Sequence, residues 1–233
     1  MNSGLVILPA FNEEKFIAPV ISGIKEVDGG IDILVIDDGS NDKTVEIAEE
    51  LGAMVISHPY NTGYGAALQT GFRFAFNRNY DFALTIDADG QHDPESIPSI
   101  LKSMNNTGAD IVIGSRFLEG GYRMSFARRI GSWIFAGVAR CYTGYRFTDP
   151  TSGFQLLNRR AFSYLSQEEV YPLDYPDVNI IMLLHKKQFK IIESPVRMVI
   201  NAESDTMHSG MKPLVYVVRM LLAIIMILLR KED

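Results

Sequence analysis

Leu84-Thr85-Ile86-Asp87-Ala88-Asp89-Gly90-Gln91-His92 is the stretch of sequence from which the fold can be worked out. The apolar run over 82–86 predicts a buried strand, and it ends in two carboxylates separated by one residue. Because alternate residues of a strand point the same way, Asp87 and Asp89 are expected to converge beyond its carboxyl end. Gly90 permits a sharp turn there, and Asp93 is expected to cap a following helix.

Two neighbouring carboxylates repel each other, so their pairing makes sense if a divalent cation lies between them. Gln91 offers a third oxygen, and oxygen ligands suit Mg²⁺ or Mn²⁺ better than zinc. The alternative is a polar strand-to-helix turn whose acids only cap the helix and face solvent. His92 would contact a ligand in the first case and hydrogen-bond to backbone in the second.

Strands and helices alternate on both sides of this stretch. Further apolar strands are expected at 5–8, 32–36, 53–57 and 110–114, with helices at 12–27, 41–51 and 61–77. Asn12 is expected to cap the first of these helices. The strands are apolar throughout, which predicts an α/β fold with a parallel sheet covered on both faces. Since ligands bind beyond the carboxyl ends of such strands, residues 11–13, 37–39 and 87–89 should line one crevice.

Composition narrows the class of protein. The chain has 233 residues, 47% of them hydrophobic, and a formal net charge of −6, which argues against nucleic acid as a partner. Six arginines nevertheless lie between Arg116 and Arg146, opposed only by Glu119. They either receive phosphate groups or form a solvated helix face. A single cysteine and the lack of a basic leader are consistent with a reducing compartment.

Gly63 and Gly65 follow the third strand and resemble the start of a dinucleotide-binding fingerprint. Leu68 stands where the third glycine of that fingerprint belongs, so a loop that approaches a nucleotide or its phosphates is the better interpretation.

Seven short motifs occur in order along the chain. They are Pro9-Ala10-Phe11-Asn12-Glu13, Asp37-Asp38-Gly39-Ser40, Asn61-x-Gly63-x-Gly65-x-Ala67, Asp87-Ala88-Asp89-Gly90-Gln91-His92, Gly114-Ser115-Arg116, Arg128-Arg129-Ile130-Gly131-Ser132 and Asp149-Pro150-Thr151-Ser152-Gly153-Phe154. This ordered set, which covers about 5–162, resembles the family 2 inverting glycosyltransferases. The closest likeness is to the dolichyl-phosphate mannose synthase branch. The resemblance implies a GT-A type, Rossmann-like and mostly parallel sheet.

The resemblance also implies roles for individual residues. The nucleotide sugar would be bound by Pro9, Ala10, Phe11, Asn12, Glu13, Asp37, Asp38, Gly39, Gly63, Gly65, Asp87 and Ala88. The divalent metal, Mg²⁺ or Mn²⁺, would be held by Asp87, Asp89 and Gln91. Asp89 would share the catalytic work with Arg116, Arg128 and Ser132, which would grip the donor diphosphate, the acceptor phosphate, or both.

The acceptor implied by this branch is a polyprenyl phosphate. Its oxygen is already anionic near neutral pH, so no strong general base is required. Family members that glycosylate hydroxyl groups carry a later Glu-Asp motif and a Gln-x-x-Arg-Trp motif, and this chain has neither. Asp174 and Asp177 are the remaining candidates for a base, although helix capping explains them as well.

The C-terminal run over 214–229 is apolar except for Arg219. At ~1.5 Å per residue it falls short of the ~30 Å bilayer core, and cationic residues flank it. An interfacial or partner-docked helix is favoured over a short membrane span or an ordinary buried helix. We therefore expect a GT-A glycosyltransferase domain over 1–200, then a polar loop and a membrane-associating apolar helix over 201–233. By resemblance, a small membrane-protein subunit is a plausible partner.

The sequence thus predicts inverting transfer of a hexose from a UDP- or GDP-sugar to undecaprenyl or dolichyl phosphate, at the cytoplasmic face of a membrane. One alternative is a transferase that extends a surface polysaccharide through attack by a sugar hydroxyl, which needs a general base. A second is a non-catalytic membrane adaptor that only binds nucleotide sugars.

Overall fold

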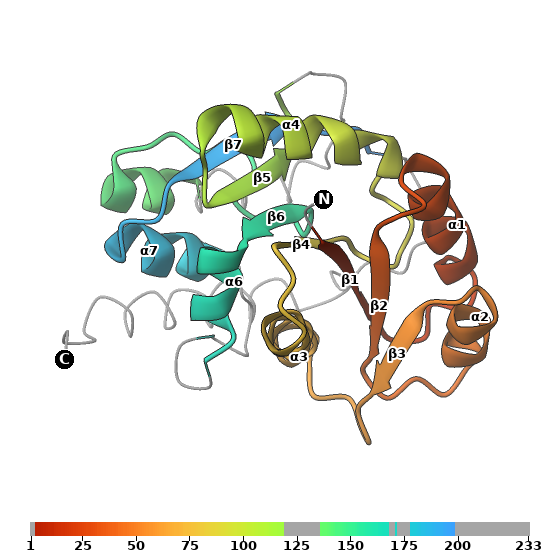
Figure 1. Ribbon diagram of the computed structural model, residues 1–233. Coiled ribbons are helices and arrows are strands. Elements are labelled where there is room, and N and C mark those ends of the chain that lie inside the picture. The colour runs from red at the N-terminus through yellow and green to blue at the C-terminus, as the bar shows by residue number, and fades with distance from the viewer. Residues whose placement is uncertain (1–2, 119–135, 168–170, 172–177, 199–233) are drawn as a thin grey trace.

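The computed structural model describes residues 3–118, 136–167, 171 and 178–198, and Figure 1 shows how their helices and strands are arranged. The strands are β1 (Gly4–Ala10), β2 (Asp32–Asp37), β3 (Met54–Ser57), β4 (Phe82–Thr85), β5 (Ile111–Ser115), β6 (Gln155–Asn158) and β7 (Ile191–Pro195). The helices are α1 (Ile17–Val27), α2 (Thr44–Glu50), α3 (Tyr64–Asn77), the 3₁₀ turn η1 (Pro94–Ser96), α4 (Ile97–Thr107), α6 (Arg159–Leu165) and α7 (Val178–Lys186). Residues 136–143 are also helical.

The described strands form one seven-stranded sheet in the order β3-β2-β1-β4-β6-β5-β7. Every neighbouring pair is parallel except the two that involve β6, which runs antiparallel to β4 and β5. The predicted α/β architecture with a mostly parallel sheet is confirmed. Strands β6 and β7 were not predicted, and they complete the half of the sheet beyond β4.

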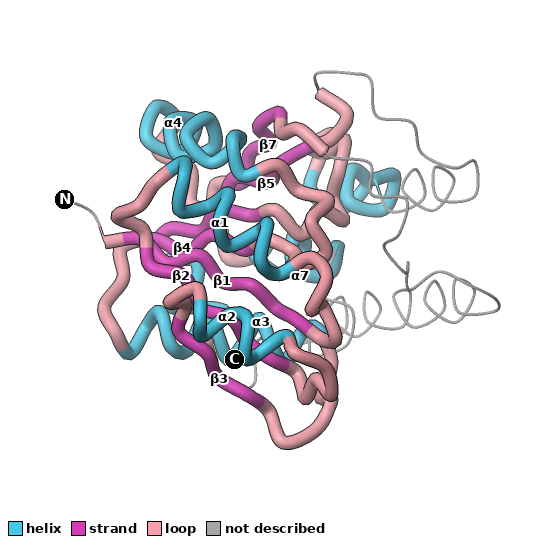
Figure 2. Tube along the Cα trace, turned by 90° about the vertical axis from the view of Figure 1, so that its right-hand side faces the viewer, coloured by secondary structure: helices cyan, strands magenta, loops and turns pink. Residues whose placement is uncertain are grey.

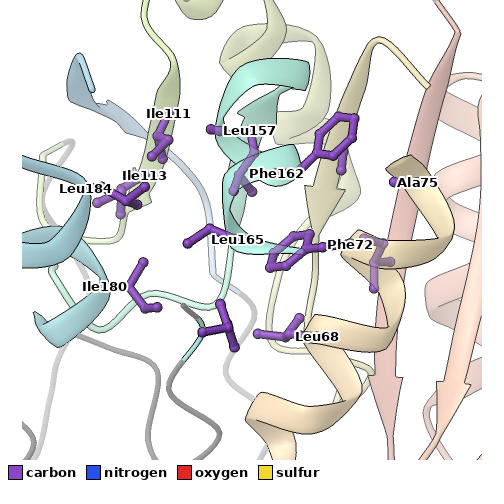
Figure 3. Packing of buried hydrophobic residues seen from close by; sticks show 14 of the residues in the cluster. Leu68, Phe72, Ala75, Ile111, Ile113, Leu157, Phe162, Leu165, Ile180 and Leu184 are labelled. Atoms are coloured by element: carbon purple, nitrogen blue, oxygen red, sulfur yellow. The ribbon is translucent and has the colours of Figure 1, made fainter. Parts of the chain in front are cut away.

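Helices cover both faces of the sheet, as Figures 1 and 2 show. Leu5 and Ile7 of β1 point into a core with α3, α6 and α7, while Val6 and Leu8 point into a second core with α1, α2 and α4. This alternation along one strand explains why the strand is apolar on both sides. Figure 3 shows the first core, where Leu68 and Phe72 of α3 face side chains of β6, α6 and α7.

The functional edge follows from this topology. Strands β1, β2, β4 and β5 point the same way, so their carboxyl ends lie at one edge. Because β6 is antiparallel, the segment that precedes it, 149–154, enters at that same edge. The turns after β1, β2 and β4 therefore meet the Asp149–Phe154 segment there.

One predicted helix cap, Asn12, is wrong, and another, Asp93, is confirmed. Helix α1 begins at Ile17 rather than at Asn12, and its N-cap residue Phe16 makes no side-chain cap. Asn12 instead adopts a left-handed φ of 58°, and its side chain accepts a hydrogen bond from the Asn41 N–H at 2.9 Å. The Asn12 side chain is thus used to join two turns. Asp93 does cap the next helical segment, as predicted, by accepting from the Glu95 N–H at 3.0 Å.

None of the helices in the described part of the chain is long and apolar enough to cross a membrane. The expected C-terminal helix over 214–229 lies outside the described residues.

Candidate active site

Asp87 lies in the turn that leaves β4, and three neighbours surround its carboxylate. Tyr64 Oη donates to Asp87 Oδ1 at 2.9 Å, and His92 Nε2 lies 3.3 Å from Oδ2. On a third side is Gly153, where a Cβ atom would come within 2.4 Å of Oδ2. Only glycine leaves room there, so the Asp149–Phe154 segment fixes where Asp87 can lie.

His92 is almost completely buried, and its ring lies against Phe154, with the ring centroids 5.4 Å apart. Its Nδ1 atom has no hydrogen-bond partner among the described residues. The proton of the neutral ring is therefore assigned to Nε2, because a buried Nδ1–H would be left without an acceptor. In this tautomer the Nε2–H group donates a hydrogen bond to Asp87. Neither sequence-based interpretation of His92 foresaw this contact with Asp87.

Asp89 and Gln91 form a compact turn beside Asp87. Asp89 Oδ1 accepts from the Gln91 N–H at 3.0 Å, and Asp89 Oδ2 accepts from Gln91 Nε2 at 2.7 Å. Burial and the charge of Asp87 raise the pKa of Asp89 above its usual range. Burial alone would also raise the pKa of Asp87, but hydrogen bonds from His92 and Tyr64 and the positive charge of Arg116 lower it.

Glu13, in the turn after β1, lies in the negative potential of Asp87 and Asp89. Burial, followed by the charges of Asp89, Asp87 and Asp42, raises the pKa of Glu13 to about 7. Glu13, Asp87 and Asp89, which belong to the turns predicted to line one crevice, are therefore close enough for their charges to interact.

The donor set fits a divalent cation. No group of three or more His, Cys, Asp or Glu side chains that could hold a metal occurs among the described residues. The ligands predicted from the sequence are two carboxylates and an amide, and the structure places the Gln91 amide against Asp89. Two carboxylates whose charges oppose each other, with Gln91 beside them, are the oxygen ligands that Mg²⁺ and Mn²⁺ prefer.

The turn after β2 is tied to the loop before α3. Asp38 Oδ1 accepts from the Thr62 N–H at 2.9 Å and lies 2.8 Å from His58 Nδ1, while Oδ2 accepts from the Gly63 N–H at 2.7 Å. These bonds lower the pKa of Asp38 although burial acts to raise it. Asp38 thus organises the loop that carries Gly63 and Gly65.

The other residues predicted to bind the nucleotide take two kinds of position. Pro9 and Ala10 belong to β1 itself, paired with Ile36 and Asp37 of β2, and all are buried. Phe11 is 43% exposed at the edge of the sheet, where a flat ligand can stack on it. Gly39 has a φ of 80°, and a Cβ there would lie 2.8 Å from the Tyr60 carbonyl carbon.

Arg116 at the end of β5 is paired with a buried acid. Arg116 Nε and Nη2 donate to the two Asp149 oxygens at 2.6 and 2.7 Å, and the Arg116 backbone N–H donates to Oδ2 at 3.1 Å. The sequence had assigned Asp149 to a motif without a role. Arg128 and Ser132, the other predicted phosphate ligands, lie outside the described residues, as do Asp174 and Asp177.

A family model described as Glycosyl transferase family 2 matches residues 5–165. The chain belongs to glycosyl transferase family 2. The matched segment runs from β1 to the end of α6, so it contains every turn described above, whereas β7 lies outside it.

Relatives within and around this family match most of the chain. An uncharacterized protein of Methanocaldococcus jannaschii is 36% identical over 201 residues, which are 83% of this chain and 80% of that protein. An undecaprenyl-phosphate mannosyltransferase of Micrococcus luteus is 28% identical over 214 residues, covering 88% and 87%. A UDP-N-acetylglucosamine–dolichyl-phosphate N-acetylglucosaminyltransferase of Methanococcus voltae is 29% identical, covering 83% and 84%.

Solved structures of glycosyl transferases share the fold. Glucosyl-3-phosphoglycerate synthase of Mycobacterium tuberculosis, in complex with phosphoglyceric acid, superposes with a TM-score of 0.74 at 18% identity, covering 100% of this chain and 82% of that one. The same enzyme with Mn²⁺, UDP and phosphoglyceric acid gives 0.72 at 20% identity, covering 97% and 78%. The GT-A type fold predicted from the sequence is confirmed.

Proposed function

We propose that this protein transfers a hexose, with inversion, from a nucleotide-sugar donor to a polyprenyl phosphate. The observation that carries the proposal is the pair Asp87 and Asp89 at the carboxyl edge of the sheet, with the charge of Arg116 close enough to lower the pKa of Asp87. Relatives named as undecaprenyl- and dolichyl-phosphate sugar transferases support the choice of acceptor.

The donor is bound by the turns after β1 and β2 and by the loop before α3. Phe11 offers an exposed ring to the base, and Glu13 offers a carboxylate to the base or ribose. Asp37 is buried and accepts from the Ser40 N–H at 3.0 Å, so it shapes the turn that carries Gly39. Gly63, held by Asp38, leaves backbone close to the nucleotide. In this proposal Pro9, Ala10 and Asp38 do not contact the donor, but they position the residues that do.

Asp87, Asp89 and Gln91 hold the divalent cation of the donor, Mg²⁺ or Mn²⁺. When bound, this cation acts as a Lewis acid that offsets the charge of the departing nucleoside diphosphate. Tyr64 and His92 keep Asp87 oriented for that role. A solved neighbour of the same fold was crystallised with Mn²⁺ and UDP, which supports the choice of cation.

Arg116, Arg128 and Ser132 bind the phosphate groups of donor and acceptor. Guanidinium groups suit phosphate oxygens because they form two parallel hydrogen bonds. The acceptor phosphate is anionic near neutral pH, since its second pKa is about 6, and it attacks without a general base. Replacement of Arg128 should then weaken use of the lipid phosphate more than binding of the donor.

The proposal divides the chain into a catalytic domain over 1–200 and a membrane-associating segment over 201–233. The segment brings the domain to the cytoplasmic face of a membrane, where polyprenyl phosphates present their head groups. A small membrane-protein subunit would dock against the same segment.

The test incubates the full chain with polyprenyl phosphate in detergent and with a panel of labelled UDP- and GDP-sugars. We expect label to enter an organic-extractable lipid with one donor, and EDTA to abolish the transfer. Label that appears only in polysaccharide would favour a hydroxyl acceptor and a general base. Donor binding without release of a nucleoside diphosphate under any acceptor would identify a non-catalytic adaptor.

A further inference from the structure

Strand β7 carries an acid that belongs to none of the sequence motifs. Glu193 lies on this edge strand, paired with β5 through Ile113, and outside the segment that matches the family model. Its side chain points along the sheet edge to the turn at 148–149, where it binds backbone rather than a basic side chain.

The Glu193 carboxylate accepts every donor that this turn offers. Oε1 accepts from the Asp149 N–H at 2.7 Å, and both oxygens lie within 2.9 Å of the Thr148 nitrogen. Oε2 also accepts from Thr148 Oγ1 at 2.9 Å. Two consecutive backbone N–H groups that converge on one anion form a concave site for negative charge. The turn is therefore shaped around a carboxylate.

The next contact passes from the turn to Arg116. Asp149 is completely buried and receives the Nε and Nη2 groups of Arg116 at 2.6 and 2.7 Å. Thr148 Oγ1 lies 2.6 Å from Ser115 Oγ, which holds the turn against the end of β5. A chain of hydrogen bonds thus runs from Glu193 through the turn to the guanidinium.

This arrangement brings a second acid, Glu193, close to the buried Asp149. Asp149 receives the Nε and Nη2 groups of Arg116, whereas Glu193 beside it binds the backbone and hydroxyl groups of the turn. Burial, and further the charge of Asp149, raise the pKa of Glu193. The hydrogen bonds from Thr148 and Asp149 act in the opposite direction and favour the charged form of Glu193. Together the two acids give Arg116 a fixed direction.

We propose that Glu193 is a positioning residue for Arg116: it binds the 148–149 turn, and the turn holds Asp149 against the guanidinium. The inference rests on the proposed function in one respect, namely that Arg116 binds the donor diphosphate. Glu193 itself touches no substrate.

The decisive variant is Glu193→Gln. Glutamine keeps one acceptor oxygen but turns an amide NH₂ toward the N–H groups of the turn, so the bonds to Thr148 and Asp149 are not all retained. The matched control is Glu95→Gln, the same chemical change at an acid whose side chain is 72% exposed and 3.4 Å from Arg197.

The first readout needs no activity. The Nε–H of Arg116, assigned in ¹H–¹⁵N spectra with Arg116→Lys, should exchange slowly with water in the native protein because Asp149 binds it. Glu193→Gln should raise this exchange rate about 10-fold or more, and Glu95→Gln should leave it unchanged. An Arg116 signal that Glu193→Gln does not affect would overturn the inference.

The second readout is donor binding and turnover. Misplacement of a binding group by about 1 Å costs up to about 100-fold, so Glu193→Gln should raise the donor KM or lower kcat by about 10- to 100-fold. In the Arg116→Lys background the same change should have almost no further effect, because the two residues act in series. Fully additive losses would contradict the inference.

If Glu193→Gln does not fold, Thr148→Val tests the positioning of Arg116 in its place. It keeps the backbone bonds to Glu193 and removes the hydroxyl contacts to Glu193 and Ser115, so we expect about a 3-fold rise in Arg116 exchange. No rise in this variant would overturn the inference. If the exchange pattern holds while the native protein transfers no sugar, the proposed function fails and the positioning role stands.

Discussion

Three acids from two turns define the chemistry of the site at the scale of single residues. Asp87 is kept ionised by His92 and Tyr64, whereas the pKa of Asp89 and that of Glu13 are both raised by burial and by neighbouring negative charge. Without a cation, burial and the charge of Asp87 therefore oppose the ionisation of Asp89 and Glu13. The protonation of Glu13 should therefore leave a signature in the stability of the metal-free protein.

Replacement of Glu13 by Gln tests this signature. Because burial and Asp89 raise the pKa of Glu13 from 4.5 to about 7, the folded state binds more protons than the unfolded state between these values. The contribution of Glu13 to stability then falls as the pH rises through this window. Discounted for its partial exposure, removal of the charge should stabilise the metal-free protein at pH 8 by about 1 kcal/mol, or ~2–4 °C in Tm.

The pH comparison contains its own control. At pH 4, where Glu13 is largely protonated in both states, Glu13→Gln should change the Tm little. Glu26→Gln, on the exposed side of α1, should give the same small difference at both pH values. An equal Tm shift for Glu13→Gln at pH 4 and pH 8 would show that negative potential at this turn is not the cause.

Gly153 is a second test at the residue scale. A Cβ there would lie 2.4 Å from Asp87 Oδ2, so Gly153→Ala should push the carboxylate away from its position. We expect transfer to fall by about 100-fold. Mn²⁺ should raise the Tm of the native protein, and Gly153→Ala should lose this rise.

The matched control is Gly137→Ala, because Gly137 is helical and exposed, and no atom of the described residues lies within 4 Å of its Cβ position. This change should leave activity and the Mn²⁺ effect intact and stabilise the helix by up to about 1 kcal/mol. A Gly153→Ala protein that keeps both properties would mean that Asp87 can function elsewhere.

At the scale of elements, the site is assembled by contacts between turns rather than within them. Asp38 at the end of β2 binds the Thr62 and Gly63 N–H groups before α3, and His58 after β3 completes the link by bonding Thr70 on α3 at 3.0 Å. This set holds helix α3, which carries Tyr64, at a fixed distance from Asp87.

The change Asp38→Asn should therefore destabilise the protein by about 2 kcal/mol, since hydrogen bonds to charged groups contribute more than neutral ones. Asparagine has a single acceptor oxygen, whereas the donors around Asp38 bind both of its carboxylate oxygens. Denaturant unfolding measures the loss. Asp28→Asn serves as the control, because Asp28 is exposed and, among the described residues, its side chain accepts from the Gly30 N–H alone. Equal losses for the two variants would contradict the role given to Asp38.

The sequence predicted the elements that carry long apolar runs, and it missed those that do not. Strands β1 to β5 were found because their side chains pack on the two cores. Strand β6 offers only Leu156 and Leu157 between polar residues, and β7 contains Glu193, so neither has a clear strand pattern. Asn12 looked like a helix cap because its type favours that position, but its bond to Asn41 determines its conformation.

The candidate site, like the fold, was predicted only in part. The motifs identified residues that converge on the carboxyl edge because that convergence follows from parallel topology alone. The contacts of His92, Gly153 and Asp149 depend on the antiparallel strand β6, which places the Asp149–Phe154 segment beside β4. The local sequence does not indicate this pairing. Arg128 and Ser132 remain predictions.

At the scale of the whole molecule, the proposal requires a catalytic domain that works at a membrane surface. The full chain should float with vesicles that contain anionic lipid, because lysine and arginine flank the apolar run over 214–229. Lower binding to neutral vesicles, and release in high salt, would indicate an interfacial attachment. A chain that stays at the bottom of the gradient with both kinds of vesicle would contradict the assignment of 201–233.

The central claim is that Asp87 and Asp89 hold a cation against the diphosphate of a nucleotide sugar. The most direct measurement is an anomalous difference map, at the manganese absorption edge, from crystals soaked with Mn²⁺ and a nucleoside diphosphate. We expect one peak within coordination distance of both a carboxylate of this pair and the diphosphate oxygens. A peak elsewhere, or a bound diphosphate with both side chains turned away from it, would contradict the claim.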